Sequence, residues 1–183
     1  GLVFTPRSKR HVSIEQALAV CEVLPPFITK VALFMDQDRD EVQRILDQVP
    51  IDYLQFHGAE TADFCQQFQR PFLKALAMGG ASAQEVAEQL PAWRKASALL
   101  FDAHAAGESG GKGEVFDWSL LPQDAPVPMI LAGGLNPSNV AEAVRGIRPF
   151  AVDVSSGVEA SPGLKDPILL QQFVEEVRRG DIA

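Results

Sequence analysis

Residues 128–166 read PMILAGGLNPSNVAEAVRGIRPFAVDVSSGVEASPGLKD and carry the strongest structural signal of the chain. Two short apolar runs, at residues 129–132 and 150–154, each end in a turn of small residues. These turn residues are Gly133, Gly134, Ser155, Ser156 and Gly157. Two such turns on neighbouring parallel strands leave backbone N–H groups to bind an anion, as after strands 7 and 8 of phosphate-binding (β/α)8 barrels. The stretch therefore predicts a phosphate site at one edge of a parallel sheet.

Apolar runs of strand length recur along the chain, and the segments between them carry helical periodicity. The runs cover residues 1–4, 31–36, 51–56, 72–77, 98–103, 128–133 and 150–154. Buried strands that alternate with amphipathic helices indicate a parallel sheet covered by helices. The chain has no GxGxxG motif and no P-loop lysine, which disfavours a nucleotide-binding sheet. We therefore predict a single α/β domain, residues 1–183, folded as a (β/α)8 TIM barrel whose strands 2–8 are visible and whose first βα unit is absent.

Capping residues mark the expected helix starts. Three pairs have the spacing of a capping box, namely Ser13 with Gln16, Asp38 with Glu41, and Ser82 with Glu85. Two more helices are predicted to begin with an N-cap followed by a proline, at Asn136-Pro137 and at Asp166-Pro167.

The composition is that of an ordinary globular domain, with 46% hydrophobic and 22% charged residues. A net charge of −8 argues against a nucleic-acid partner, which selects basic surfaces. No apolar run approaches the roughly 18 residues that span a bilayer, so we expect no membrane partner. The first residues do not read as a secretory signal, and we expect a cytoplasmic protein. Cys21 and Cys65 have no metal-site spacing and are predicted to be reduced core residues.

Asp102 ends the apolar run of the fifth strand and is the main candidate for catalysis. A partly desolvated carboxyl group at a barrel mouth can have its pKa raised enough to donate a proton near neutral pH. The alternative roles are a helix N-cap or an ion-pair partner of Lys112. The glycine-rich loop that follows, residues 107–113, is predicted to close over a phosphate through Gly111 and Gly113.

His57 and Gln55 lie at the end of the third strand, where they are two residues apart and therefore share one face. His57 is a candidate substrate contact, although a structural hydrogen-bonding role is the stronger alternative. Gln55 is a candidate polar contact inside the barrel. We assign no role to His11 or His104, which we place in loops.

Arg10 and Asp153 are charged residues at strand ends. A guanidinium at the barrel rim is suited to a carboxylate, which it binds through two parallel N–H groups. The alternative for Arg10 is an ordinary surface arginine. Asp153 is a candidate contact to the sugar part of a ligand.

Seven motifs in order resemble those of the phosphoribosylanthranilate isomerases of tryptophan biosynthesis. They are SKRHVS, VALFMD, LQFHGAE, LKAL, LLFDA followed by GGKGEVFDW, LAGGLNPSNV, and AVDVSSGVEASPGLKD. The resemblance implies an Amadori rearrangement of N-(5-phosphoribosyl)anthranilate to 1-(2-carboxyphenylamino)-1-deoxyribulose 5-phosphate, with no metal and no organic cofactor. It also implies a small-molecule phosphoribosyl substrate and a monomer or homodimer.

The resemblance implies roles for individual residues. Asp102 matches the general acid that protonates the ribose ring oxygen, the two small-residue turns match the phosphate site, and Arg10 matches the arginine at the anthranilate end. Lys112 replaces the threonine of the family's GGTG. The family's general base is a cysteine in a KICG segment on the first strand. Cys21 and Cys65 cannot replace it from helices, so we expect residues 1–183 alone to lack the base and to be inactive.

Two alternatives remain on the sequence. Another phosphate-binding barrel, such as a ribulose-phosphate epimerase or a histidine-pathway isomerase, is disfavoured by FDW together with SSGVE and GLKD. A catalytically incomplete fragment that only binds phosphate compounds is the alternative that is not an enzyme.

Overall fold

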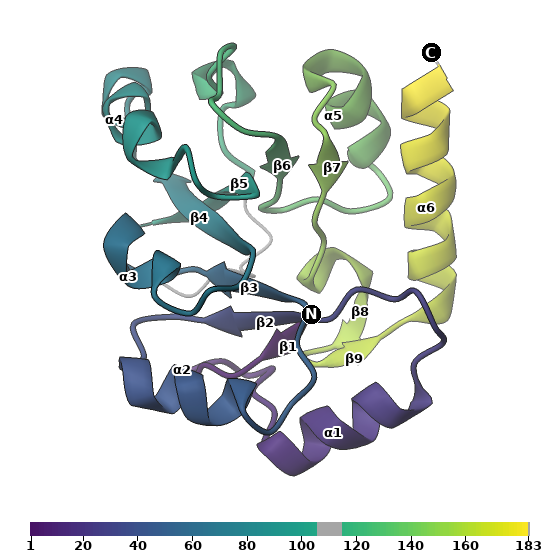
Figure 1. Cartoon of the computed structure of the whole chain (residues 1–183). Coiled ribbons are helices and arrows are strands. Elements are labelled where there is room, and N and C mark those ends of the chain that lie inside the picture. The colour runs from purple at the N-terminus through teal and green to yellow at the C-terminus, as the bar shows by residue number, and fades with distance from the viewer. Residues whose placement is uncertain (106–114, 183) are drawn as a thin grey trace.

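The computed structural model describes residues 1–105 and 115–182 and shows a curled parallel sheet covered by helices (Figure 1). Seven strands follow one another in chain order, and each is parallel to the next. They are β1 (Leu2–Val3), β2 (Val31–Phe34), β3 (Tyr53–Phe56), β4 (Phe72–Gly79), β5 (Ala98–Ala105), β6 (Met129–Leu131) and β7 (Ala151–Val152). The α/β class and the barrel-like curl are therefore confirmed, with β1 and β7 as the edge strands of the described sheet.

The helices lie on the outer side of the curled sheet (Figure 1). They are α1 (Ile14–Val23), α2 (Arg39–Leu46), α3 (Ala62–Gln66), α4 (Ala83–Gln89), α5 (Val140–Ile147) and α6 (Pro167–Ile182). Three short 3-10 helices lie in the connecting segments, namely η1 (Leu90–Trp93), η2 (Trp118–Leu120) and η3 (Ser156–Val158). A small hairpin is formed by β8 (Glu159–Ser161) and β9 (Leu164–Lys165). None of the described helices is long and apolar enough to span a membrane.

Most of the predicted helix starts are confirmed. Ser13 and Ser82 form complete capping boxes, and Asp38 caps α2. The Asp166 carboxylate accepts hydrogen bonds from the first turn of α6. The prediction at Asn136-Pro137 is wrong, because these residues form a turn in which the Asn136 side chain accepts from Ser138, and α5 begins only at Val140.

The strands divide their side chains between two environments, because successive residues point to opposite faces of a sheet. On the outer face, Phe34, Phe56 and Phe101 are fully buried against the helices. On the inner face, Leu100 packs in a small cluster with Ala75 and Ala132. The positions that follow Leu100 on the same face are 102 and 104, so the inner face becomes polar toward the carboxyl end of β5.

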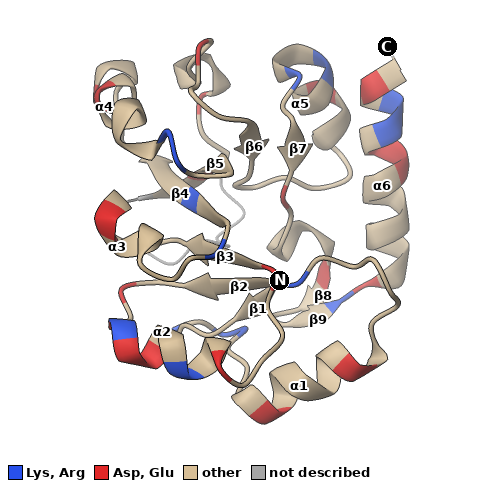
Figure 2. Cartoon of the chain, viewed as in Figure 1, with Lys and Arg blue, Asp and Glu red and all other residues tan. Residues whose placement is uncertain are grey.

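The predicted end of the fourth strand is wrong. The predicted run covers residues 72–77, whereas β4 continues to Gly79, and Lys74 lies inside it. Its buried ammonium group lies 3.0 Å from the Glu60 carboxylate and 5.3 Å from the centre of the Trp93 ring. Elsewhere the charged residues gather mainly on helices and loops (Figure 2). A charge inside a strand is tolerated here because it is paired.

The two cysteines are unpaired, as predicted. Cys65 lies on α3 in the core, where burial raises the pKa of its thiol to about 12. Cys21 is half-buried on α1. A thiol that stays protonated inside a helix–sheet core packs as a small apolar side chain.

Candidate active site

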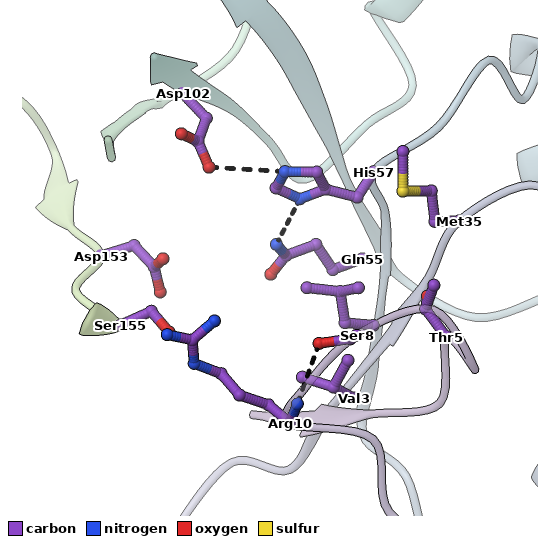
Figure 3. A pocket seen from close by; sticks show the side chains of 11 residues that line it. Val3, Thr5, Ser8, Arg10, Met35, Gln55, His57, Asp102, Asp153 and Ser155 are labelled. Atoms are coloured by element: carbon purple, nitrogen blue, oxygen red, sulfur yellow. Dashed lines mark hydrogen bonds and ion pairs between the residues drawn. The ribbon is translucent and has the colours of Figure 1, made fainter. Parts of the chain in front are cut away.

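A pocket of about 90 Å³ opens on the inner side of the sheet at the carboxyl ends of the strands (Figure 3). This is the end at which barrel enzymes build their active sites. Strands β1, β2, β3, β5 and β7 and the segments that follow them supply the lining, which consists of Val3, Thr5, Ser8, Arg10, Leu33, Met35, Gln55, His57, Asp102, Asp153 and Ser155. The structure thus brings together Arg10, Gln55, His57, Asp102, Asp153 and Ser155, all of which the sequence nominates.

Asp102 lies between two histidines. One carboxylate oxygen is 3.4 Å from Nε2 of His57, and the other is 3.6 Å from Nδ1 of His104. The two imidazole rings are 4.5 Å apart between centroids. All three residues are buried, and Asp102 also accepts a 3.3 Å hydrogen bond from the backbone N–H of His104. Asp102 lies within β5, so it is not a helix N-cap.

The pKa of Asp102 is lowered rather than raised, contrary to the expectation from the sequence. Burial opposes ionisation, yet the nearby His104 and His57 side chains favour the charged form more strongly, and the pKa of Asp102 lies well below its ordinary value. The carboxylate is therefore the resting form of Asp102. Burial alone would raise the pKa, but the two neighbouring imidazoles reverse the direction of the shift.

Asp153 is the carboxyl group whose pKa is raised. Its position deep in the concave face and the like charge of Asp102 both favour the neutral form. Asp153 opens to the main pocket, which it lines together with Asp102. Two carboxyl groups whose environments push their pKa values apart are typical of acid–base sites.

His104 is the residue that the sequence analysis missed. It belongs to β5 rather than to a loop, and it lies on the same face as Asp102 because the two are two residues apart. The two-residue spacing from Asp102 is the sequence signal that identifies His104. His57 is both a structural hydrogen-bonding residue and a pocket residue, since its Nδ1 lies 3.2 Å from the Gln55 amide nitrogen while its ring faces the pocket (Figure 3).

The two small-residue turns meet around a second cavity of about 30 Å³, next to Asp102 and Asp153. The turn residues that line it are Gly133, Gly134, Ser155 and Ser156. Gly157 lies where any side chain would collide with the backbone, because an added Cβ would be 1.9 Å from the Leu135 carbonyl oxygen. The predicted meeting of the turns is confirmed, whereas Gly111, Gly113 and Lys112 lie outside the described residues.

Gly133→Ala is expected to destabilise the protein more than Gly80→Ala. Both glycines have a φ near +80°, which costs roughly 1–2 kcal/mol for a residue with a Cβ. The Cβ of residue 80 would meet nothing within 4 Å, but that of residue 133 would lie 2.3 Å from the Ala103 nitrogen. Urea unfolding of both variants measures the difference. Equal losses would show that the turn relaxes away from β5 without cost.

Arg10 reaches the pocket from the segment after β1. Its Nε and Nη2 donate to the two oxygens of Glu159 at 2.7 and 2.6 Å. Lys165 also donates to Glu159, at 2.9 Å. The predicted fork of N–H groups therefore exists, but one side of it is occupied by Glu159. A ligand carboxylate would bind the remaining N–H groups on Nη1.

Glu159→Gln is expected to lower the free energy of unfolding above pH 5 and to have a decreasing effect as the pH falls toward 2. The hydrogen bond from Arg10 and the charge of Lys165 outweigh burial and lower the pKa of Glu159 to about 2. Since the unfolded value is about 4.3, the stabilisation is complete above pH 5 and is lost as the pH falls toward 2. Urea unfolding of wild type and variant should therefore converge between pH 5 and pH 2. A gap that does not change with pH would contradict this role.

Known proteins share the sequence and the fold. A family model described as N-(5'phosphoribosyl)anthranilate (PRA) isomerase matches residues 1–176. An N-(5'-phosphoribosyl)anthranilate isomerase of Pseudomonas fluorescens is 49% identical over 99% of this chain and 85% of its own length.

Two solved structures agree with this result. The phosphoribosyl anthranilate isomerase of Thermotoga maritima superposes with a TM-score of 0.85 at 35% identity, over 97% of this chain and 86% of that one. A phosphoribosyl anthranilate isomerase in complex with reduced 1-(o-carboxyphenylamino)-1-deoxyribulose 5-phosphate gives a TM-score of 0.82 with the same identity and coverage. The family model, the close relative and the shared fold agree with the resemblance of the motifs, and the chain belongs to the N-(5'-phosphoribosyl)anthranilate isomerase family.

Proposed function

We propose that this chain serves the Amadori rearrangement of N-(5-phosphoribosyl)anthranilate to 1-(2-carboxyphenylamino)-1-deoxyribulose 5-phosphate, together with a general base from outside residues 1–183. The observation that supports it best is that Asp102 lines both the main pocket and the cavity between the two small-residue turns. A phosphate bound by the turns would therefore hold the attached ribose next to this carboxyl group. Arg10 lies in the same pocket and would bind the carboxylate of the anthranilate ring through Nη1.

The turns suit a phosphate in an acidic protein because they bind through backbone groups rather than through lysines. Among the described residues, no acceptor is bonded to the backbone N–H groups of Gly134 or Ser155. The glycine-rich loop would add contacts through Gly111 and Gly113. Gln55, His57 and Asp153 would contact the ribose hydroxyl groups.

Asp102 would act as the general acid. Protonation of the ring oxygen makes it a leaving group, and the ring opens to an iminium ion that acidifies the proton on C2. Removal of that proton gives an enolamine, which becomes the ketone, so the reaction is an isomerisation with no net change in protons. The bound phosphate and carboxylate would raise the pKa of Asp102 by their negative charge, and the carboxyl group would then take up the proton that it donates.

The general base would come from outside residues 1–183. Neither Cys21 nor Cys65 lines the pocket, and both lie on outer helices. We propose that a cysteine on a further βα unit, placed between the edge strands β1 and β7, removes the C2 proton. We also propose a cytoplasmic enzyme that is a monomer or a homodimer.

A test compares residues 1–183 with the same chain extended by its upstream coding sequence. We expect the extended protein to form the product, detected by chromatography, and residues 1–183 to form none. Inorganic phosphate should slow hydrogen exchange at residues 133–134 and 155–157 in both proteins. Turnover by residues 1–183 alone would contradict an outside base. Phosphate protection without turnover in either protein would support the alternative, a chain that only binds phosphate compounds.

A further inference from the structure

The His57, Asp102 and His104 side chains form a compact group of potential metal ligands. One ligand atom from each lies within 4.8 Å of the other two. Each residue is at most 9% exposed. Nε2 of His57 and Nδ1 of His104 have no hydrogen-bond partner within the part of the chain that the structure describes. Among the described residues, these two buried nitrogens thus face one carboxylate at 3.4 and 3.6 Å without forming a hydrogen bond to it.

Buried polar atoms without partners are rare, and each one calls for an explanation such as an ion. A cation placed between the two rings would accept a lone pair from each ring nitrogen and a lone pair from a carboxylate oxygen of Asp102. It would satisfy all three groups at once and would offset the cost of burying them.

We propose that His57, Asp102 and His104 bind one zinc ion, with Nε2, Nδ1 and the carboxylate as ligands and water in the remaining position. Two imidazoles and one carboxylate with an open position form a recognised ligand set for zinc and related divalent ions. Zinc–ligand lengths of about 2.0–2.2 Å place the ligand atoms of a tetrahedral site roughly 3.3–3.6 Å apart. The observed nitrogen–oxygen separations are of this size, 3.4 Å from His57 to one Asp102 oxygen and 3.6 Å from His104 to the other, so each ring faces a different oxygen of the carboxylate.

The surroundings suit such a site. Gln55 contacts the other ring nitrogen of His57, Nδ1, at 3.2 Å. Rotation of its amide by half a turn lets the amide oxygen accept from Nδ1–H, which leaves the lone pair on Nε2 for the metal. Water also reaches the group from two sides, because His57 borders the main pocket and both histidines border a separate cavity of about 230 Å³.

Zinc would act as an inhibitor. The ion would occupy the Asp102 carboxylate, so Asp102 could not carry a proton, and this consequence rests on the proposed function. The binding itself does not. Binding requires only the three side chains. Because the chain has three histidines, the contribution of each one to zinc binding can be measured separately.

The first experiment measures zinc binding by equilibrium dialysis after treatment of the full protein with a chelator. We expect one zinc per chain, and at least a tenfold weaker affinity in His104→Gln. The matched control is His11→Gln, which changes the exposed histidine and should bind zinc as wild type does. No retained zinc in wild type, or unchanged affinity in a folded His104→Gln protein, would overturn the site. Circular dichroism checks that each variant is folded.

The second experiment uses wild type alone and therefore tests the zinc site even if His104→Gln fails to fold. In NMR spectra of the imidazole groups, zinc should shift the signals of His57 and His104 and leave that of His11 unchanged. A shift of His11 alone, or no shift of His57 and His104, would overturn the proposal. Because neither experiment measures turnover, failure of the isomerase assay would leave the result on zinc intact.

Discussion

Asp102→Asn is expected to lower kcat of the active enzyme by about 10²–10⁴-fold, the usual contribution of a general acid or base. The carboxamide has the same shape but cannot donate the proton that opens the ribose ring. The phosphate turns and Arg10 remain in place, so KM should change little. Steady-state rates at several substrate concentrations separate the two constants.

The matched control for this variant is Asp124→Asn, the same chemical change at an exposed position outside the pocket. We expect its kcat to equal that of wild type. Near wild-type turnover in Asp102→Asn would remove Asp102 from the acid role. In that case Asp153→Asn is the next variant to measure, because Asp153 shares both cavities with Asp102 and its pKa is raised.

Lys74→Met is expected to lower the free energy of unfolding by about 3–5 kcal/mol, the usual loss when one partner of a buried ion pair is removed. The side chains of Lys74 and Glu60 are only 5% and 3% exposed. Glu60 also accepts hydrogen bonds from the backbone N–H groups of Asp36 and Gly58, so it cannot turn toward solvent without breaking them. Urea unfolding monitored by circular dichroism measures the loss.

Lys30→Met is the matched control, because Lys30 forms a comparable 2.8 Å pair with Asp52 that is 22% and 43% exposed. Pairs of this kind contribute about 0–1 kcal/mol. Adding Glu60→Gln to Lys74→Met should recover part of the loss by removing the uncompensated charge. If Lys74→Met and Lys30→Met cost the same, the buried pair contributes no more than a surface pair.

The sequence predicts the fold and the position of the two cavities well because both depend on local signals. The small-residue turns at residues 133–134 and 155–157 end apolar strands, and parallel strands bring their carboxyl ends to one edge. The two-residue spacing of Gln55 and His57 predicts their shared face. His104 carries the same signal relative to Asp102, but the apolar run ends at residue 103, whereas β5 continues to Ala105.

Other features depend on side chains that are distant in sequence, and no local pattern contains them. Lys74 interrupts the apolar run of β4, and its partner Glu60 comes from the loop before α3. The lowered pKa of Asp102 depends on His57, which arrives on another strand. The ion pair between Arg10 and Glu159 likewise depends on the hairpin β8–β9, which contains Glu159.

The Arg10–Glu159 pair has a consequence for the order of folding. Every strand of the sheet pairs with its neighbour along the chain, so these pairings close short loops. The Arg10–Glu159 contact joins residues 149 positions apart. Contacts between distant residues cost more loop-closure entropy and form after local ones. We therefore expect the rim of the pocket to be completed last, so that a folding intermediate would have its sheet formed before it gains a competent ligand site.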